Sequence, residues 1–241
     1  IKLMLTEEQK QRYNRQIILQ DFGERGQEIL LCSKCLVVGV GGLGSIISLY
    51  LAAAGAGTIG LVDNDKVSIS NLQRQIVYRE KQQGLPKATT AAQNLKALNS
   101  GCNFVAYDCF LTEENAEEII SKYDIVLDAT DNFKARYLIN DTCKRLGKPF
   151  VYSSISATCG QVALFDFPNC KSSYRSLYPD EERLSKRENP SKAVIGVLPG
   201  VAACIATNEA IKYLAKMGES LSDKLLCFDI STNVFQTFDI E

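Results

Sequence analysis

The chain has 241 residues, of which 46% are hydrophobic and 23% charged, and its formal net charge is -1. This length and composition predict one globular α/β domain, and the balanced charge argues against nucleic acid or a membrane surface as a partner. No apolar run approaches the length of a membrane span, and no signal-peptide pattern begins the chain. We therefore expect a cytoplasmic protein.

The chain contains nine cysteines and no histidine. Cysteines scattered through apolar segments indicate reduced thiols of the core, because disulfide frameworks belong mainly to small secreted domains. The absence of histidine excludes Ser/His/Asp triads, Cys/His dyads and histidine-bound metals. Any chemistry must therefore use carboxylates, amines, guanidinium groups, thiols or a bound cation.

The N-terminal region, residues 6–31, is predicted to be helical. It opens with Thr6-Glu7-Glu8-Gln9, which fits a capping box, and we expect Gly23 and Gly26 to break it in two. From composition alone, the polar segment around Arg15 is interpreted as a solvated helix face.

A glycine-rich turn after the first strand is the central motif of the sequence. An apolar strand over residues 35–38 leads into glycines at G-x-G-x-x-G spacing, and a helix-like stretch continues to Ala54. Without Cβ atoms, such a turn lets backbone amides approach a diphosphate at the positive end of the helix. A second strand, residues 58–62, ends in an acid that can bind ribose hydroxyls. The pattern predicts a nucleotide site, without deciding which nucleotide, at Gly39, Gly41, Gly44 and Asp63.

Two further segments place polar and charged groups beside this turn. Residues 64–75 form a polar loop at the carboxyl ends of the strands, where open α/β sheets bind ligands. Pro86 suits the first turn of another helix, and Lys87 follows it. A lysine at a helix N-terminus is electrostatically unfavourable, so a bound anion nearby would compensate for it. The alternative is a surface lysine with no role.

A second acidic motif follows a later strand. Residues 124–128 are predicted as a strand that leads to Asp128-Ala129-Thr130-Asp131-Asn132. Asp131 is placed to hold a magnesium ion, which takes one or two carboxylates together with substrate phosphates. The alternative is that Asp131 or Asn132 caps the helix predicted over residues 133–146.

The remaining segments complete an alternation of strands and helices. Residues 160–167 are predicted as an antiparallel edge strand, and residues 225–239 as a β-hairpin. Between them, residues 168–192 are polar, and we expect a mobile crossover loop. The order predicts a doubly wound, Rossmann-like, mainly parallel sheet with antiparallel C-terminal strands, in a single domain over residues 1–241. The other predicted elements are strands at 103–107 and 149–154 and helices at 112–122 and 196–216.

With these residues in view, the chain resembles the ThiF/MoeB/HesA family, the bacterial relatives of ubiquitin-activating enzymes. The shared motifs run from the N-terminal helix to the fourth strand, and the helix that ends at Lys212 is also similar. The motifs are RYNRQI at residues 12–17, GVGGLG at residues 39–44 with Asp63, SNLQRQ at residues 70–75, Gly-x-Pro-Lys at residues 84–87 and DATDN at residues 128–132.

The resemblance implies an enzyme that uses ATP and Mg²⁺ to adenylate the C-terminal carboxylate, ending Gly-Gly, of a ubiquitin-fold sulfur-carrier protein. The carboxylate is itself the nucleophile, so no histidine is needed, and cations must stabilise the charge of the triphosphate. Arg15 resembles an arginine that reaches the triphosphate from the other subunit of a homodimer. By the same resemblance, the nucleotide cradle is Gly39, Gly41, Gly42 and Gly44, the ribose ligand is Asp63, the phosphate contacts are Asn71, Arg74, Gln75 and Lys87, and the magnesium ligand is Asp131.

Departures from the family pattern concern cysteine. Members commonly bind a structural zinc through two Cys-x-x-Cys pairs, but here the first segment is residues 173–177, SYRSL, and no second pair follows. Serine is a poor zinc ligand and Cys32 and Cys35 offer only two thiols, so we predict no zinc. Some members also carry a reactive cysteine where this chain has Asn189, and Cys170 is the only thiol in that loop. The prediction is an enzyme that stops at the acyl-adenylate.

Alternative functions remain at this point. The carboxylate could belong to a short peptide of a specialised pathway, or the chain could be a non-catalytic nucleotide-binding scaffold. A NAD-dependent oxidoreductase shares the glycine turn and its acid, but it has no use for three cations and a magnesium carboxylate. The carrier, the pathway and the fate of the adenylate stay open. A scaffold is disfavoured because Arg15, Asn71, Arg74, Lys87 and Asp131 are intact.

Overall fold

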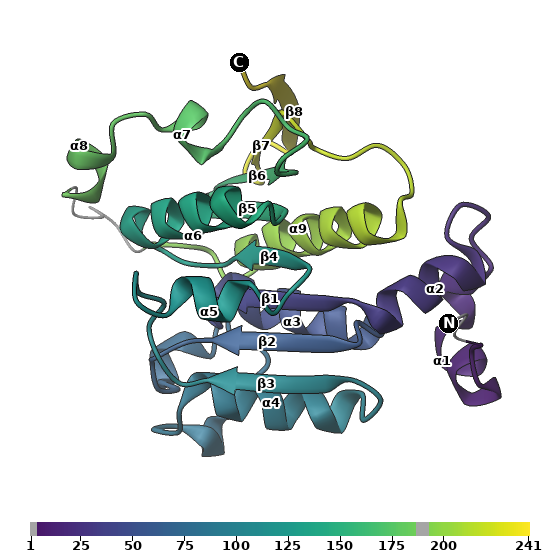
Figure 1. The fold of residues 1–241 in the computed structure, drawn as a ribbon. Coiled ribbons are helices and arrows are strands. Elements are labelled where there is room, and N and C mark those ends of the chain that lie inside the picture. The colour runs from purple at the N-terminus through teal and green to yellow at the C-terminus, as the bar shows by residue number, and fades with distance from the viewer. Residues whose placement is uncertain (1–3, 187–192) are drawn as a thin grey trace.

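The computed structural model describes residues 4–186 and 193–241, and its centre is one mixed sheet (Figure 1). The strands in these residues pair in the order β3-β2-β1-β4-β5-β6-β7-β8. Pairing is parallel from β3 to β5 and antiparallel from β5 to β8. This confirms the predicted fold class. The strands are β1 (Lys34–Val38), β2 (Thr58–Val62), β3 (Asn103–Tyr107), β4 (Ile125–Asp128), β5 (Phe150–Ser156), β6 (Cys159–Phe165), β7 (Lys224–Asp229) and β8 (Val234–Asp239).

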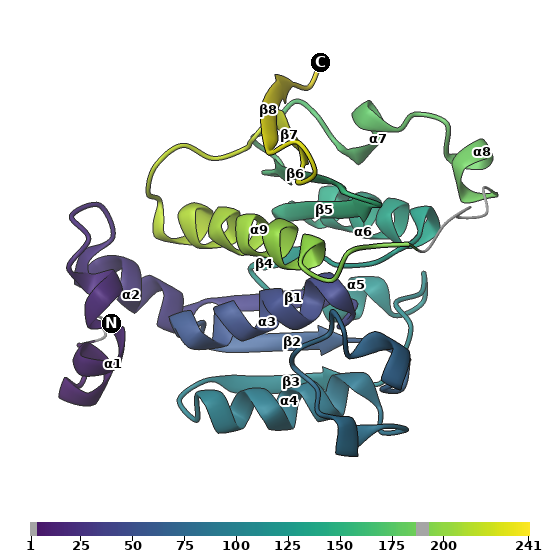
Figure 2. The ribbon, with the colours of Figure 1, turned by 180° about the vertical axis from the view of Figure 1, so that it is seen from behind.

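Helices cover both faces of the sheet (Figures 1 and 2). Helices α2, α3, α4 and α9 share a hydrophobic core on one face, and α5, α6 and α7 share another on the opposite face. Helix α1 lies beside α2, at the end of the sheet where β1 begins. No helix in the described residues is both long and apolar enough to cross a bilayer. The helices are α1 (Glu7–Ile17), α2 (Gly23–Cys32), α3 (Gly42–Ala54), α4 (Lys87–Leu98), α5 (Ala116–Ile120), α6 (Phe133–Leu146), α7 (Tyr174–Leu177), α8 (Glu181–Ser185) and α9 (Leu198–Ala215).

The central strands have the continuous apolar runs that a parallel sheet needs when helices cover both of its faces. Strand β4 is buried at all four positions, and β1 at every position after its first. Strand β8 is an outer strand paired with β7 and is exposed at every position, because its residues belong to neither hydrophobic core. The core therefore concentrates around the strands that carry the candidate site.

Local signals predicted several element bounds correctly. The strands over residues 58–62 and 103–107 and the helix over residues 133–146 match residue for residue. Thr6 forms the predicted capping box with Gln9. These elements have strong local signals, namely a cap, a terminating glycine or an apolar run.

Other predicted bounds differ from the structure. The break between α1 and α2 falls at residues 18–22, just before Gly23, which begins α2 with a φ of +59°, whereas Gly26 lies inside that helix. Helix α5 is only five residues long, because turns occupy the start of the predicted segment. Strand β6 is not an edge strand, since β7 and β8 continue the sheet beyond it.

The polar segment after β6 also differs from the expected loop. Its described part, residues 168–186, contains α7 and α8, and Tyr174 is fully buried. Asp223 accepts hydrogen bonds from the backbone N–H of Lys171 at 2.9 Å and from the backbone N–H and hydroxyl of Ser172 at 2.7 and 2.6 Å. These bonds join residues about fifty positions apart, so polar composition alone did not indicate them. Residues 187–192 lie outside the described part.

The cysteines are free thiols, as predicted, but not all of them belong to the core. Cys35, Cys102 and Cys143 are buried, whereas Cys204 is exposed and Cys227 only partly buried. Burial raises the pKa of Cys102 to about 11, so this thiol stays protonated at neutral pH.

A substitution at Gly57 tests the close approach between the end of α2 and the start of β2. A Cβ atom at Gly57 would overlap the carbonyl oxygen of Leu31, whereas Gly200, inside α9, has nothing within 4 Å. We expect Gly57→Ala to lower the free energy of unfolding by about 1–3 kcal/mol, because backbone must move to admit the methyl group. Gly200→Ala, the same change in open space, should leave it unchanged or raise it by up to about 1 kcal/mol. Urea unfolding followed by circular dichroism measures both, and equal effects would contradict the close approach.

Candidate functional site

Most of the predicted site residues gather at one edge of the sheet, where the parallel strands end. The glycine turn follows β1, Asp63 follows β2, and Asp131 comes three residues after the end of β4 at Asp128. In Figure 1 the arrowheads of β2 and β3 point to this edge, away from α1 and α2. Open α/β sheets usually bind ligands at this edge.

Two glycines of the turn, Gly39 and Gly44, have no room for a side chain. Gly39 has a φ of +88°, and a Cβ atom there would lie 2.7 Å from the carbonyl oxygen of Ala129. A Cβ atom at Gly44 would overlap the carbonyl oxygen of Gly39. Gly41 caps α3 without a side chain, and Gly42 is the first residue of that helix. The turn therefore leaves the amides at the positive end of α3 to a ligand.

Asp63 is hydrogen-bonded to the backbone of this turn. Its Oδ2 accepts a hydrogen bond from the backbone N–H of Val40 at 2.7 Å, and its Oδ1 accepts one from the backbone N–H of Asp65 at 2.8 Å. Burial raises the pKa of Asp63, while these hydrogen bonds and the charge of Lys87 oppose the rise. Each carboxylate oxygen keeps a second lone pair, so Asp63 can still accept from ribose hydroxyls.

The polar loop after β2 folds back over the glycine turn. The carbonyl oxygen of Asn71 accepts hydrogen bonds from the backbone N–H groups of Arg74 and Gln75, both at 3.0 Å. This turn brings Cδ of Arg74 to 3.5 Å from the position of a Cβ at Gly42. Its Nη1 donates to the carbonyl oxygen of Ser70 at 3.2 Å. The guanidinium group therefore comes from a loop that touches the first turn of α3.

Gln75 is the buried member of this loop. It is only 4% exposed, and its Nε2 lies 3.6 Å from the position of a Cβ at Gly41. Its Oε1 is buried and has no hydrogen-bond partner in the described structure. Because an unpaired buried oxygen is costly, we expect a donor from a ligand or a water molecule at this atom.

Lys87 is a buried cation at the start of α4, directly after the N-cap residue Pro86. It is 4% exposed, and its Nζ donates to Oδ2 of Asp65 at 2.9 Å. Its backbone N–H donates to the carbonyl oxygen of Asp65 at 2.8 Å. Asp65 thus compensates for a lysine at a helix N-terminus, as a bound phosphate also would. No role was predicted for Asp65, because no spacing rule relates residues 22 positions apart.

The DATDN segment decides which residue caps the helix that follows it. The side chain of Asn132 caps α6 by accepting a hydrogen bond from the backbone N–H of Ala135 at 2.9 Å. Asp131 is exposed and leaves the capping to its neighbour. Within residues 4–186 and 193–241, no three His, Cys, Asp or Glu side chains form a metal cluster. The magnesium role of Asp131 stays a prediction.

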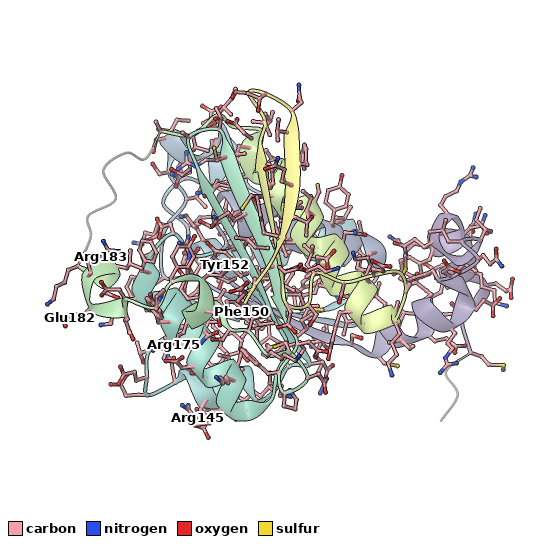
Figure 3. The ribbon with its side chains drawn as sticks, turned by 90° about the horizontal axis from the view of Figure 1, so that it is seen from above. Arg145, Phe150, Tyr152, Arg175, Glu182 and Arg183 are labelled. Carbon is pink, nitrogen blue, oxygen red and sulfur yellow. The ribbon has the colours of Figure 1, made fainter. Side chains whose placement is uncertain are left out.

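A buried ion pair lies beneath this segment. Oδ2 of Asp128 is 3.7 Å from Nε of Arg136, and Oδ1 accepts from the backbone N–H of Thr130 at 2.8 Å. Nη2 of Arg136 donates to the carbonyl oxygen of Thr130 at 2.9 Å, and the guanidinium carbon is 5.7 Å from the ring centre of Tyr152, labelled in Figure 3. Arg136 was not among the residues predicted from the sequence. Both side chains hold the backbone that leads into Asp131.

Arg15 is not brought to this edge. It is exposed on α1, which packs at the opposite end of α3. There, Nε2 of Gln16 donates to the carbonyl oxygen of Ala54 at 3.1 Å, and the hydroxyl of Tyr13 accepts from Nδ2 of Asn99 at 2.8 Å. The 13 residues of α3 span about 18 Å at 1.5 Å per residue. The side chain of Arg15 is therefore too far from the glycine turn of its own chain.

In residues 173–177, where family members commonly carry zinc-binding cysteines, the serines cap a helix. Ser173 and Ser176 form a reciprocal capping box at the start of α7, and the backbone N–H of Ser173 donates to Oγ of Ser176 at 3.2 Å. Arg175, labelled in Figure 3, pairs with Asp141 at 2.5 Å and with Glu181 at 2.7 Å. These contacts anchor the segment through protein groups. The absence of zinc stays a prediction.

The cysteines considered for chemistry differ in their surroundings. Cys35 is fully buried, as expected, and Cys32 is exposed. Burial raises the pKa of Cys170 to about 11, which opposes formation of a reactive thiolate. Asn189 lies outside the described residues.

The sequence model of the ThiF family matches residues 13–241. The chain belongs to the ThiF family. The match runs from α1 to the end of the chain, and it confirms the resemblance drawn from the motifs.

Curated relatives include enzymes that are similar over most of the chain. The chain is 43% identical over 229 residues to the sulfur carrier protein adenylyltransferase of Thermus thermophilus, covering 93% of this chain and 84% of that protein. It is 40% identical over 238 residues to the SAMP-activating enzyme E1 of Haloferax volcanii, covering 98% and 87%. With the adenylyltransferase and sulfurtransferase MOCS3 of Arabidopsis thaliana, the identity is 42% over 93% of this chain and 48% of that protein. The chain thus spans about half of the MOCS3 protein, and the expected enzyme class, a ThiF-type adenylyltransferase, is confirmed.

Solved structures share the fold. The crystal structure of selenomethionine PaaA has a TM-score of 0.84 over 100% of this chain and 76% of that chain, with 23% sequence identity. E. coli MccB with ATP has a TM-score of 0.80 over 90% of this chain and 66% of that chain, with 22% identity. At these identities the similarity shows the fold alone.

The buried Asp128 predicts a pH-dependent contribution to stability. Desolvation raises its pKa from 3.8 to about 6 in the folded chain, and the charge of Arg136 only partly opposes the rise. Between about pH 4 and pH 6, the native state therefore holds a proton that the unfolded state has lost. The stabilisation is complete below about pH 4 and is lost as the pH rises through about 6, about 3 kcal/mol in all.

Asp128→Asn removes this titration and isolates it from other groups. The free energy of unfolding of the wild type minus that of Asp128→Asn should decrease as the pH rises from 4 to 8. Urea unfolding at several pH values measures both proteins. A difference that does not change with pH, or that increases, would contradict the raised pKa.

Proposed function

We propose that this chain activates the C-terminal carboxylate of a ubiquitin-fold sulfur-carrier protein by adenylation with Mg-ATP. The observation that carries the proposal is the meeting of the glycine turn, Arg74 and buried Lys87 at one edge of the sheet. Relatives at 43% and 40% identity are named as an adenylyltransferase of sulfur carrier proteins and an activating enzyme of SAMP. A cytoplasmic location would fit the free thiols.

The residues at this edge are suited to a reaction between two anions. A carboxylate oxygen of the carrier attacks the α-phosphorus of ATP, the bond to the bridging oxygen breaks, and pyrophosphate leaves with the electron pair. In this proposal Arg74 and Lys87 stabilise the charge on the phosphates, and the amides at the start of α3 hold them in place. Asp63 orients the ribose, and Asn71 and Gln75 supply polar contacts. Mg²⁺ held by Asp131 would supply further positive charge.

We also propose that the active form is a homodimer in which Arg15 acts in trans. Its position at the far end of α3 supports this, because an arginine there cannot reach the site of its own chain. Ile18 and Leu19, which lie between α1 and α2, are 63% and 52% exposed. Apolar side chains of this kind are typical of surfaces that another subunit covers.

Adenylation of another carboxylate, such as that of a short peptide, is the second candidate. Ser173 and Ser176 stand where family members commonly carry cysteines, and such a departure is compatible with a different substrate. The replacement of those cysteines by serine does not change the residues that are proposed to contact the phosphates.

ATP–pyrophosphate exchange with magnesium tests the proposed reaction. Wild type should show exchange with one member of a panel of Gly-Gly-ending ubiquitin-fold carriers and short C-terminal peptides. Arg74→Ala and Lys87→Ala should each lower the exchange rate by at least about 100-fold, because each removes a cation from the developing charge. Thermal melting should show that both variants still fold.

Arg145→Ala is the matched control, since Arg145 forms a surface ion pair with Glu117 at 3.0 Å, away from this edge. It should keep the wild-type rate. Wild-type turnover in Arg74→Ala or Lys87→Ala would refute the assignment of these residues. Binding of Mg-ATP without exchange on any carrier would favour another carboxylate or a scaffold.

Subunit mixing tests whether Arg15 acts in trans. Arg15→Ala and Arg74→Ala should each be inactive alone, but a heterodimer of the two has one site with both arginines intact. Random exchange of equal amounts should therefore restore about a quarter of the wild-type activity. Mixing Arg74→Ala with Lys87→Ala is the control and should restore no activity. Both residues act in the site of their own chain, so each site of that heterodimer lacks one of them. Equal results from the two mixtures would count against the trans role.

A further inference from the structure

Val40, the residue between the first two glycines of the turn, is held on both sides. Its backbone N–H donates to Oδ2 of Asp63 at 2.7 Å, and its carbonyl oxygen accepts a hydrogen bond from the hydroxyl of Tyr78 at 2.8 Å. Val40 and Tyr78 are 38 positions apart in the chain and both are buried. The orientation of the peptide groups in the glycine turn therefore depends on two side chains, of which only Asp63 was expected to have a role.

The same hydroxyl lies beside the start of α4. It is 3.3 Å from the carbonyl oxygen of Lys87, the residue whose Nζ is proposed to contact the phosphates. The backbone N–H of Tyr78 donates to the carbonyl oxygen of Gln75 at 3.2 Å. Tyr78 thus contacts all three segments that supply the proposed nucleotide contacts, namely the glycine turn, the loop with Arg74 and Gln75, and the first turn of α4.

The surroundings of Tyr78 fix its hydroxyl as a donor. The side chain is 4% exposed, and burial together with the nearby charges of Asp63 and Asp65 raises its pKa far above the ordinary value. The hydroxyl is therefore protonated at any physiological pH. It does not reach the reacting atoms itself, because it lies behind the turn, bonded to backbone.

We propose that Tyr78 is a positioning residue of the nucleotide site, which sets the glycine turn and Lys87 at a fixed separation through its hydroxyl. The proposal rests on the proposed ATP site. Loss of the hydroxyl would free the carbonyl oxygens of Val40 and Lys87, while the ring would still fill its place in the core. The expected consequence is weaker binding of ATP in a protein that remains folded.

Tyr78→Phe, with Tyr137→Phe as its matched control, tests this role. Tyr137 is also buried and its hydroxyl also donates to a backbone carbonyl, that of Tyr178 at 2.6 Å, but it belongs to the core on the other face. Titration calorimetry with Mg-ATP should show a Kd about tenfold weaker for Tyr78→Phe, the size of one lost hydrogen bond. The Kd of Tyr137→Phe should stay within about twofold of the wild type.

Kinetics separate positioning from general destabilisation. In pyrophosphate exchange, Tyr78→Phe should raise the KM for ATP while saturating ATP restores most of the rate, whereas a lower folded fraction would reduce kcat and leave KM unchanged. Thermal melting should show similar small losses in both variants. Equal ATP affinity in wild type and Tyr78→Phe, or equal weakening in both variants, would overturn the positioning role and leave the proposed function standing. Failure of the wild type to bind Mg-ATP would overturn both.

Discussion

The close approach of two backbone turns is the constraint on which the site depends. The carbonyl oxygen of Ala129, after β4, lies only 2.7 Å from the position of a Cβ at Gly39, and the carbonyl oxygen of Gly39 would overlap a Cβ at Gly44. Because these residues lack side chains, α3 can begin directly beneath the turn, with its free amides at the edge where β2 and β4 end. A side chain at either glycine would push the turn outward and separate these amides from Asp63 and Asp131.

The charges of the site are arranged before any ligand arrives. A buried lysine at a helix N-terminus is unfavourable by itself, and Asp65 compensates for it at 2.9 Å. Asp63 is held by the backbone of the turn that it serves, and Asp128 and Arg136 fix the backbone beneath Asp131. Fixed charges of this kind need little reorganisation when a reaction develops charge. Pairing offsets only part of the cost of burying these carboxylates, since the pKa values of Asp63 and Asp128 both stay above their ordinary value.

The sequence predicted those parts of the molecule whose signals are local. The glycine spacing, the acid that ends β2 and the cap at Asn132 each depend on a few consecutive residues, and the elements around them were predicted well. Contacts between distant residues were missed. Tyr78 meets Val40 across 38 positions and Asp223 meets Ser172 across 51. Composition marked the segment after β6 as a loop, because its buried Tyr174 packs against Tyr137 and Tyr152 and its hydrogen bonds go to Asp223, all distant in the sequence.

In the proposed dimer, the arm formed by α1 and α2 is the second functional end of each chain. Nε2 of Gln27 donates to the carbonyl oxygen of Ala54 at 2.9 Å, and Oε1 of Gln27 accepts from Nε2 of Gln16 at 2.7 Å, so buried amides fasten both helices to the end of α3. Tyr13, buried against Gly55, adds a second anchor. The packing that holds α1 here is the packing that keeps Arg15 away from its own glycine turn. In the proposed dimer, each chain therefore offers its site at the carboxyl edge of the sheet and its arginine at the amino edge, and neither end is sufficient without the other subunit.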